Sequence, residues 1–242
     1  DTDMPMILDA LAQAEGAGVV RTVSFGTRYA FVHDLVREAI YGGLPAQDRA
    51  ILHQRAAAKL ADHGDEFQIA ARAHHTLAAL PLGELADAVA LATAAGDQAR
   101  DGLAFDEAAR WYRRAHDAAS ADSAIGPRAR AELLLAEGSA LRSVASPRAE
   151  EVLSEAAVAA DGMGDMELLR RVVVTWSYRH GGAFVFGPRL RPWIARALEA
   201  PPGQDVALQA RVVGAAAIVA CLDDPPRAWE LLSVAQELAA SA

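Results

Sequence analysis

The sequence predicts an all-α fold, an α-solenoid of repeated helix pairs that follows a small module with one β-hairpin. Alanine, the strongest helix former, supplies 57 of the 242 residues. Runs rich in Val and Ile, which a β-sandwich or a doubly wound sheet requires, are mostly missing. The predicted helices come in pairs whose starts are about 40 residues apart, and a fixed period of this size with two helices per unit indicates an α-solenoid.

Residues 1–44 are predicted to form the small module. A short helix over 5–16 has an apolar face and is ended by glycines. Residues 19–33 hold two segments that alternate apolar and polar side chains, which predicts a hairpin. Asp34 is placed to cap a helix that runs to Tyr41, where two glycines follow. Helix, hairpin and helix in this order are typical of the second half of a winged-helix module, which we expect to be incomplete at its N-terminus.

A helical spacer over 45–81 follows, with predicted helices over 46–63 and 68–80. Residues 82–242 are predicted to form about four helix pairs, the last of them cut short at the end of the chain. The predicted pairs are 84–101 with 104–119, 127–142 with 147–162, 165–180 with 188–200, and 204–222 with 225–240.

The register within these pairs is similar to that of tetratricopeptide (TPR) repeats. Such a repeat needs a small residue in the middle of its first helix, where the second helix packs closely. On the second helix it needs Ala, a bulky residue and Ala at spacings of four and three, which share one face. Glycine in mid-helix costs about 1 kcal/mol against alanine and therefore indicates close packing. The third pair has only Leu190, Ile194 and Ala197, but the others have Gly96 with Ala108, Tyr112 and Ala115, Gly138 with Ala149, Leu153 and Ala156, and Gly214 with Ala228, Leu232 and Ala235.

Charge and composition exclude several classes of protein. The net charge is −9, without the clustered basic face that nucleic acids require, so we expect no direct DNA contact from this segment. The single cysteine, Cys221, excludes an intrachain disulfide and a cysteine-based zinc site, and its apolar surroundings predict a core position. The sequence has no signal peptide and no apolar run of the roughly 18 residues that span a bilayer. We therefore expect a cytoplasmic protein without membrane contact.

Two stretches of the chain resemble a known class of proteins. They are FVHDLVREAIY at 31–41, followed by LHQR at 52–55, and AAGDQA at 94–99 with FDEAARWYRRA at 105–115. Both resemble the bacterial signalling ATPases of the STAND class, specifically the large LuxR-type transcriptional activators and related cyclase-associated ATPases. In that class an NTPase domain precedes a winged-helix domain, a helical spacer, a TPR-like sensor and an effector domain. The resemblance covers most of the chain and is most specific over 31–56 and 94–115.

The resemblance implies a regulatory segment of a nucleotide-dependent transcriptional regulator. Its partners would be an NTPase domain in the same chain and a small-molecule or protein inducer bound to the solenoid; an oligomer is compatible with this. The sequence has no glycine-rich phosphate loop, and its only lysine, Lys59, lies in a predicted helix. ADP or ATP would therefore bind in the full-length protein and not in this segment, which we expect to be no enzyme. The alternative is a stand-alone TPR-type scaffold for protein–protein interactions.

His33 and Asp34 are the candidate nucleotide-sensing residues. In the class named above, a histidine at the start of the last winged-helix helix contacts the ADP phosphate, and FVHD at 31–34 stands where that motif would lie. An imidazole N–H can donate to a phosphate oxygen at a helix N-terminus, where the helix dipole favours anions. The alternative, also open, is that His33 packs between hairpin and helix and that Asp34 is only a cap.

A glycine-framed loop over 181–188 concentrates aromatic residues in a chain that has few of them. The loop and its flanks are a candidate ligand or partner site. The alternative, which we favour, is that the degenerate third repeat fills its own interior with large side chains. The residues of this group are Trp176, Tyr178, Phe184, Phe186 and Trp193.

We expect no metal site and no catalytic residues. His74 and His75 are adjacent, with His53 and His63 nearby, but neighbouring residues of a helix point about 100° apart and rarely share an ion. No acidic cluster completes a set of ligands with them. The serines lack a nucleophile-elbow context, and the carboxylates are scattered over helix faces.

Overall fold

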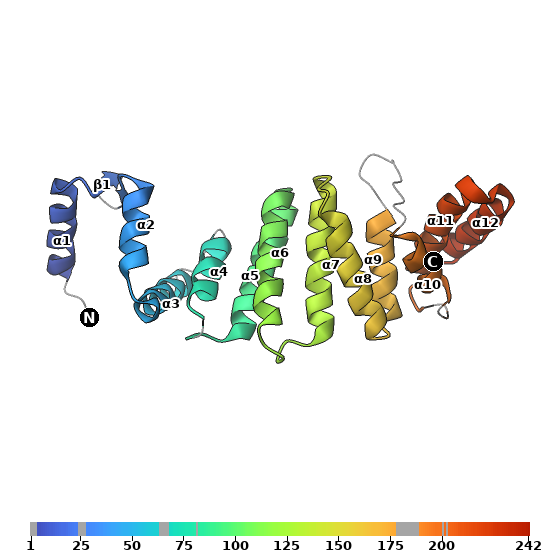
Figure 1. The fold of residues 1–242 in the computed structure, drawn as a ribbon, viewed down its shortest axis with the longest axis horizontal. Coiled ribbons are helices and arrows are strands. Elements are labelled where there is room, and N and C mark those ends of the chain that lie inside the picture. Colours follow the sequence, from blue (N-terminus) through green and yellow to red (C-terminus); the bar gives the residue numbers. More distant parts are fainter. Residues whose placement is uncertain are drawn as a thin grey trace.

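The computed structural model describes residues 4–23, 28–62, 68–80, 82–177, 189–199, 201 and 203–242. Over these residues the chain has an all-α helical-repeat fold with one small β-hairpin, comprising twelve helices and two strands. The predicted fold class is confirmed. The helices form an elongated array, with α1 at one end and α11 and α12 at the other (Figure 1).

The array begins with the hairpin and its two flanking helices. Helix α1 (Met4–Gly16) leads to strands β1 (Val20–Val23) and β2 (Arg28–Phe31), and α2 (Asp34–Gly43) follows. The strands are antiparallel, with Val20 opposite Phe31. Neither helix has a buried residue, and α1 stands apart from α2 (Figure 1). The local order agrees with the prediction, although these elements are loosely packed.

The predicted ends of α2 are wrong in two respects. His33, not Asp34, is the N-cap residue, and no side chain makes the capping hydrogen bond. Asp34 lies in the first turn instead, where its carboxylate is 3.6 Å from the Nε atom of Arg37. At the other end the helix continues through both glycines and ends before Leu44, because glycine permits a helix end but does not force one.

The spacer and the four predicted pairs follow in order. Most helix boundaries lie within two or three residues of the predicted ones, as is usual for frayed helix ends. The helices are α3 (Ala46–Asp62), α4 (Ile69–Ala78), α5 (Leu85–Asp101), α6 (Phe105–Ser120), α7 (Pro127–Ser143), α8 (Ala149–Gly162), α9 (Met166–Ser177), α10 (Arg191–Glu199), α11 (Val206–Asp223) and α12 (Pro225–Ser241).

The mid-helix glycines of the first two pairs allow the close packing that the register predicts. A Cβ atom on Gly96 would lie 2.7 Å from Cε1 of Tyr112, and one on Gly138 would lie 2.5 Å from Cδ2 of Leu153. Both partners, Tyr112 and Leu153, are fully buried. The bulky residue of each second helix therefore rests on the glycine of the first.

The fourth pair does not follow this rule. A Cβ atom on Gly214 would meet nothing within 4 Å, and Leu232, the predicted bulky residue, is 38% exposed. Leu231 packs against the core in its place, so α12 presents a neighbouring face to α11. Cys221, expected in the core, is exposed on α11.

Alanine fills the core between the helices. Ala92, Ala108, Ala115, Ala156 and Ala160 are fully buried, together with leucine and valine from α7, α8 and α9. Small side chains let neighbouring helices approach closely, which accounts for a stable array with few aromatic residues. No helix in the described part of the chain is long and apolar enough to cross a membrane.

Candidate functional site

The first helices of the four pairs together line a groove of about 350 Å³. Its apolar part consists of Leu135, Val174 and Leu208, which come from α7, α9 and α11. The four first helices, whose lining residues lie between positions 100 and 211, thus contribute to one concave site, and Tyr112 of α6 completes it. The remaining lining residues are Arg100, Tyr112, Glu132, Ala136, Ser139, Arg171, Thr175 and Arg211.

Three arginines supply the positive charge of the groove. Arg171 lies 2.6 Å from the carboxylate of Glu132, which ties α9 to α7. Both side chains remain partly exposed, so the ion pair contributes little to stability and its groups stay accessible to a ligand. Arg100 and Arg211 line the same groove from α5 and α11.

One end of the groove is held by a hydrogen-bonded group on α5 and α6. The hydroxyl of Tyr112 donates to Asp97 at 2.7 Å, and Arg100 lies 2.8 Å from the same carboxylate oxygen. Burial, and then the hydrogen bond to Asp97, raises the pKa of Tyr112 above its ordinary value, so that the hydroxyl stays protonated. The group, together with Asp101, whose carboxylate accepts from Nε and Nη2 of Arg100, fixes the position of this half-exposed arginine.

The groove can bind a small ligand or a short peptide segment that carries an anionic group. Its volume lies at the lower end of the usual range for ligand sites, about 300–1,000 Å³. Guanidinium groups match carboxylates and phosphates with two parallel hydrogen bonds. The apolar part would bury the remainder of such a ligand.

A second cavity, of about 440 Å³, lies where α6 meets α7 and contains a buried acid. Glu137 is 1% exposed, and Arg113 and Arg148 lie 3.5 Å and 3.6 Å from its Oε1 atom. Its Oε2 atom has no hydrogen-bond partner in the part of the chain that the structure describes. Burial raises the pKa of this carboxyl, and the two arginines only partly oppose that effect. The sequence analysis did not single out this residue.

The predicted nucleotide-sensing residues lie on the surface at the start of α2. His33 and Asp34 are both exposed, next to the exposed Val32 and Leu35. In the part of the chain that the structure describes, His33 is therefore not buried between hairpin and helix. Its role toward a nucleotide stays a prediction.

The predicted aromatic site is only partly within the described residues. Trp176 is a core side chain, 2% exposed, and Trp193 packs against the same core. Tyr178, Phe184 and Phe186 lie outside the described residues. Val174 and Thr175, which precede Trp176 on α9, line the groove.

The structure brings three of the four histidines considered above together. The nitrogen atoms that His53, His74 and His75 offer as ligands all lie within 4.8 Å of one another. His63 lies outside the described residues. From the sequence these histidines were considered together and a metal site was not expected, because adjacent helical histidines diverge; the crossing of α3 and α4 nevertheless brings three of them together.

No protein-family model, curated protein or solved structure matches the chain.

Proposed function

We propose that this chain is the sensor segment of a nucleotide-dependent transcriptional regulator. The helix pairs bind an anionic effector in the groove, and the hairpin module couples that binding to an NTPase domain elsewhere in the protein. The observation that carries the proposal is the groove shared by α5, α7, α9 and α11. The link to a nucleotide rests on the resemblance of residues 31–56 and 94–115.

A ligand in the groove would contact four helices at once. Each contact depends on the angle between neighbouring pairs, so the ligand binds one curvature of the array better than the others. A ligand that prefers one conformation shifts the population toward it. In this account the shift moves the hairpin module relative to the NTPase domain.

The hairpin module carries apolar side chains that nothing in the described part of the chain covers. Leu35 is 78% exposed, and Met4, Leu8 and Ile40 are also exposed on α1 and α2. Exposed large apolar side chains gathered in one module are typical of a contact with another domain or protein. This supports the coupling role, because an NTPase domain would pack on this module.

The second candidate is a stand-alone scaffold that binds another protein. Trp229 is 71% exposed on α12, with Leu232 and Val234 also exposed on that helix. Exposed tryptophan is enriched where proteins contact one another. This observation favours a protein contact at the far end of the array, with or without a nucleotide.

Substitution of Arg171 tests the groove. Small mono- and dicarboxylates and sugar phosphates, each paired with its neutral amide or alcohol, would be screened by their effect on the melting temperature. We expect selected anions, and not their neutral partners, to raise the Tm of the chain, because a ligand that binds only the folded state stabilises it. Arg171→Gln should lower that gain to near zero. Arg227→Gln, an exposed arginine on α12 paired with Glu230, is the matched control and should keep it.

An equal gain in Tm for wild type and Arg171→Gln would mean that the anion binds elsewhere. A complete lack of response to anions, with capture of a protein through α12, would favour the scaffold.

A further inference from the structure

The spacer between the hairpin module and the repeats contains a compact group of imidazoles. His53 comes from α3, and His74 and His75 come from α4. The three ring centroids form a nearly equilateral triangle, with sides of 5.6 Å (His53–His74), 5.0 Å (His53–His75) and 5.2 Å (His74–His75). Adjacent histidines do diverge around a helix, but His53 lies between them on the neighbouring helix. Both rings of α4 therefore reach it.

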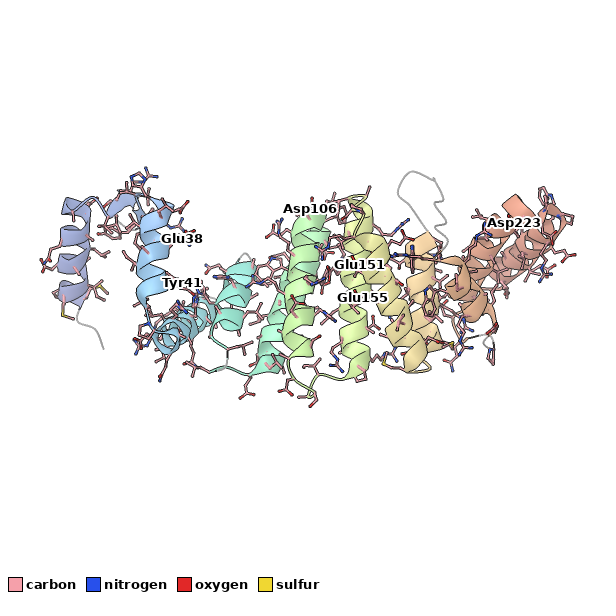
Figure 2. The ribbon with its side chains drawn as sticks, viewed as in Figure 1. Glu38, Tyr41, Asp106, Glu151, Glu155 and Asp223 are labelled. Atoms are coloured by element: carbon pink, nitrogen blue, oxygen red, sulfur yellow. The ribbon has the colours of Figure 1, made fainter. Side chains whose placement is uncertain are left out.

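Each ring nitrogen of His53 has one hydrogen-bond partner. Its Nε2 is 2.8 Å from the hydroxyl of Tyr41, and its Nδ1 is 2.7 Å from Nδ1 of His75. If Nε2–H donates to Tyr41, the Nδ1 atom carries a lone pair that points at His75. A histidine that binds a metal through one nitrogen usually donates its other N–H in this way. Tyr41 lies at the end of α2 next to α3, as Figure 2 shows.

We propose that His53, His74 and His75 form a site for a divalent transition-metal ion, Zn²⁺ in particular. Three imidazoles with an open fourth position are a known zinc ligand set, and imidazole nitrogen suits zinc better than magnesium or calcium. Ligand nitrogens around a tetrahedral zinc ion are about 3.3 Å apart, so the two Nδ1 atoms need to separate by only about 0.6 Å. His75 would move its proton from Nδ1 to Nε2 and ligate through the freed lone pair. Such a site is independent of the groove and of the proposed function.

The accessibility of the cluster favours a metal ligand. Neutral imidazoles keep the lone pairs that a metal ion requires. The open side of the cluster is at His74, which is exposed, whereas His53 is buried.

Arg114 is the charged group that faces the cluster from α6. Its Nη2 atom lies 3.4 Å from Nδ1 of His74, and its guanidinium stacks on the ring of Trp111. A cation in the cluster would be repelled by this guanidinium, so Arg114 weakens the site. Removal of the charge should therefore tighten metal binding several-fold.

A bound ion would tie α3 to α4 and fix the spacer. The hairpin module and the helix pairs lie on either side of these two helices (Figure 1). The metal would therefore limit how far the two parts can turn relative to each other.

The test is titration of the untagged chain with Zn²⁺ and with Co²⁺ at neutral pH. We expect one equivalent to bind, with a rise in Tm and with the visible absorption of a four-coordinate Co²⁺ ion. His74→Gln and His75→Gln should each weaken binding by more than about 100-fold, since loss of an outer-shell partner alone costs 10–100-fold. His116→Gln, a partly buried histidine outside the cluster, should bind as wild type does, and Arg114→Gln should bind more tightly.

The proposal is overturned if neither ion binds in a saturable way, or if His74→Gln and His75→Gln bind as tightly as the wild type. His74 is exposed, so its replacement leaves the fold intact and keeps the experiment decisive even if a His53 variant does not fold.

Discussion

Gly96 and Gly138, which have a hydrogen atom in place of a side chain, allow the two helices of the first and second pairs to pack closely. The Tyr112 ring and the Leu153 side chain occupy the space where a Cβ atom would stand. These glycines could be predicted as packing positions from their place in mid-helix, where glycine is costly without a packing reason. The same reasoning also selects Gly214, which has open space around it, because the sequence pattern does not show which face of α12 meets α11.

Gly138→Ala should destabilise the chain, and Gly214→Ala should not. The new methyl group at residue 138 would overlap the buried Leu153, and overpacking of this kind costs about 1–3 kcal/mol. At residue 214 the same change replaces a mid-helix glycine with a better helix former, which should raise the free energy of unfolding by up to about 1 kcal/mol. Urea denaturation of both variants measures the difference, and equal midpoints would contradict the packing described here.

Glu137 makes stability depend on pH through its burial. Its pKa is raised in the folded chain above the ordinary value of 4.5, so over the interval between these values the folded chain holds a proton that the unfolded chain has lost. The contribution of that proton to stability is complete below pH 4.5 and is lost as the pH rises through the folded-state pKa.

Glu137→Gln should therefore gain stability relative to wild type as the pH rises. The amide carries no charge to desolvate, whereas the wild-type carboxylate has to be charged in a buried place once the pH exceeds its raised pKa. Thermal unfolding of both proteins from acid to neutral pH measures the difference in Tm between Glu137→Gln and the wild type. Glu151→Gln, at an exposed position on α8 (Figure 2), controls for the change in net charge. If this difference in Tm became smaller toward neutral pH, the stabilisation of the charged Glu137 by Arg113 and Arg148 would exceed the cost of its burial.

At the scale of elements, the turns inside the first two pairs repeat one another. Leu103 after α5 and Ala145 after α7 both have positive φ, 61° and 54°, each seven residues beyond the packing glycine of its helix. In each turn the next amide N–H bonds back to a helix carbonyl, from Ala104 to Ala99 and from Ser146 to Leu141. This is the usual left-handed helix end, with a non-glycine residue where glycine is preferred.

Ala145→Gly should stabilise the chain by about 1 kcal/mol, because a left-handed backbone strains residues that have a Cβ atom. Ala121→Gly is the matched control, since Ala121 follows α6 with an ordinary right-handed backbone and is also exposed. That variant should lose about 0.5–1 kcal/mol through the added freedom of glycine. Chemical denaturation separates the two, and loss of stability in both variants would contradict the role given to the turn.

Sequence patterns sufficed for the existence and order of the helices but not for their ends. Runs of alanine, leucine, arginine and glutamate predicted the helices, and the alternation of apolar and polar residues over 19–33 predicted the hairpin. The prediction that Asp34 caps α2 is wrong, because a favourable residue type near a helix start does not determine which residue adopts the cap conformation. The exposure of Cys221 was not foreseen because an apolar run of helix does not show which of its faces is covered.

At the scale of the molecule, both candidate sites depend on how helices cross. The groove takes residues from five helices, and the histidine cluster takes one ring from α3 and two from α4. The arginines of the groove, Arg100, Arg171 and Arg211, have no common spacing in the sequence. The histidine cluster could not be predicted from the sequence, because it depends on how α3 and α4 cross.

The central claim is that binding to the helix array is coupled to a nucleotide through the start of α2. The most direct measurement is the rate at which ADP leaves the full-length protein that contains this chain, for wild type and for His33→Ala. The account predicts retained ADP in the wild type and release at least about tenfold faster in the variant, since a hydrogen bond to a charged group contributes about 1.5–3 kcal/mol. Equal release from both proteins, or a full-length protein that holds no nucleotide, would contradict it and leave the scaffold as the better account.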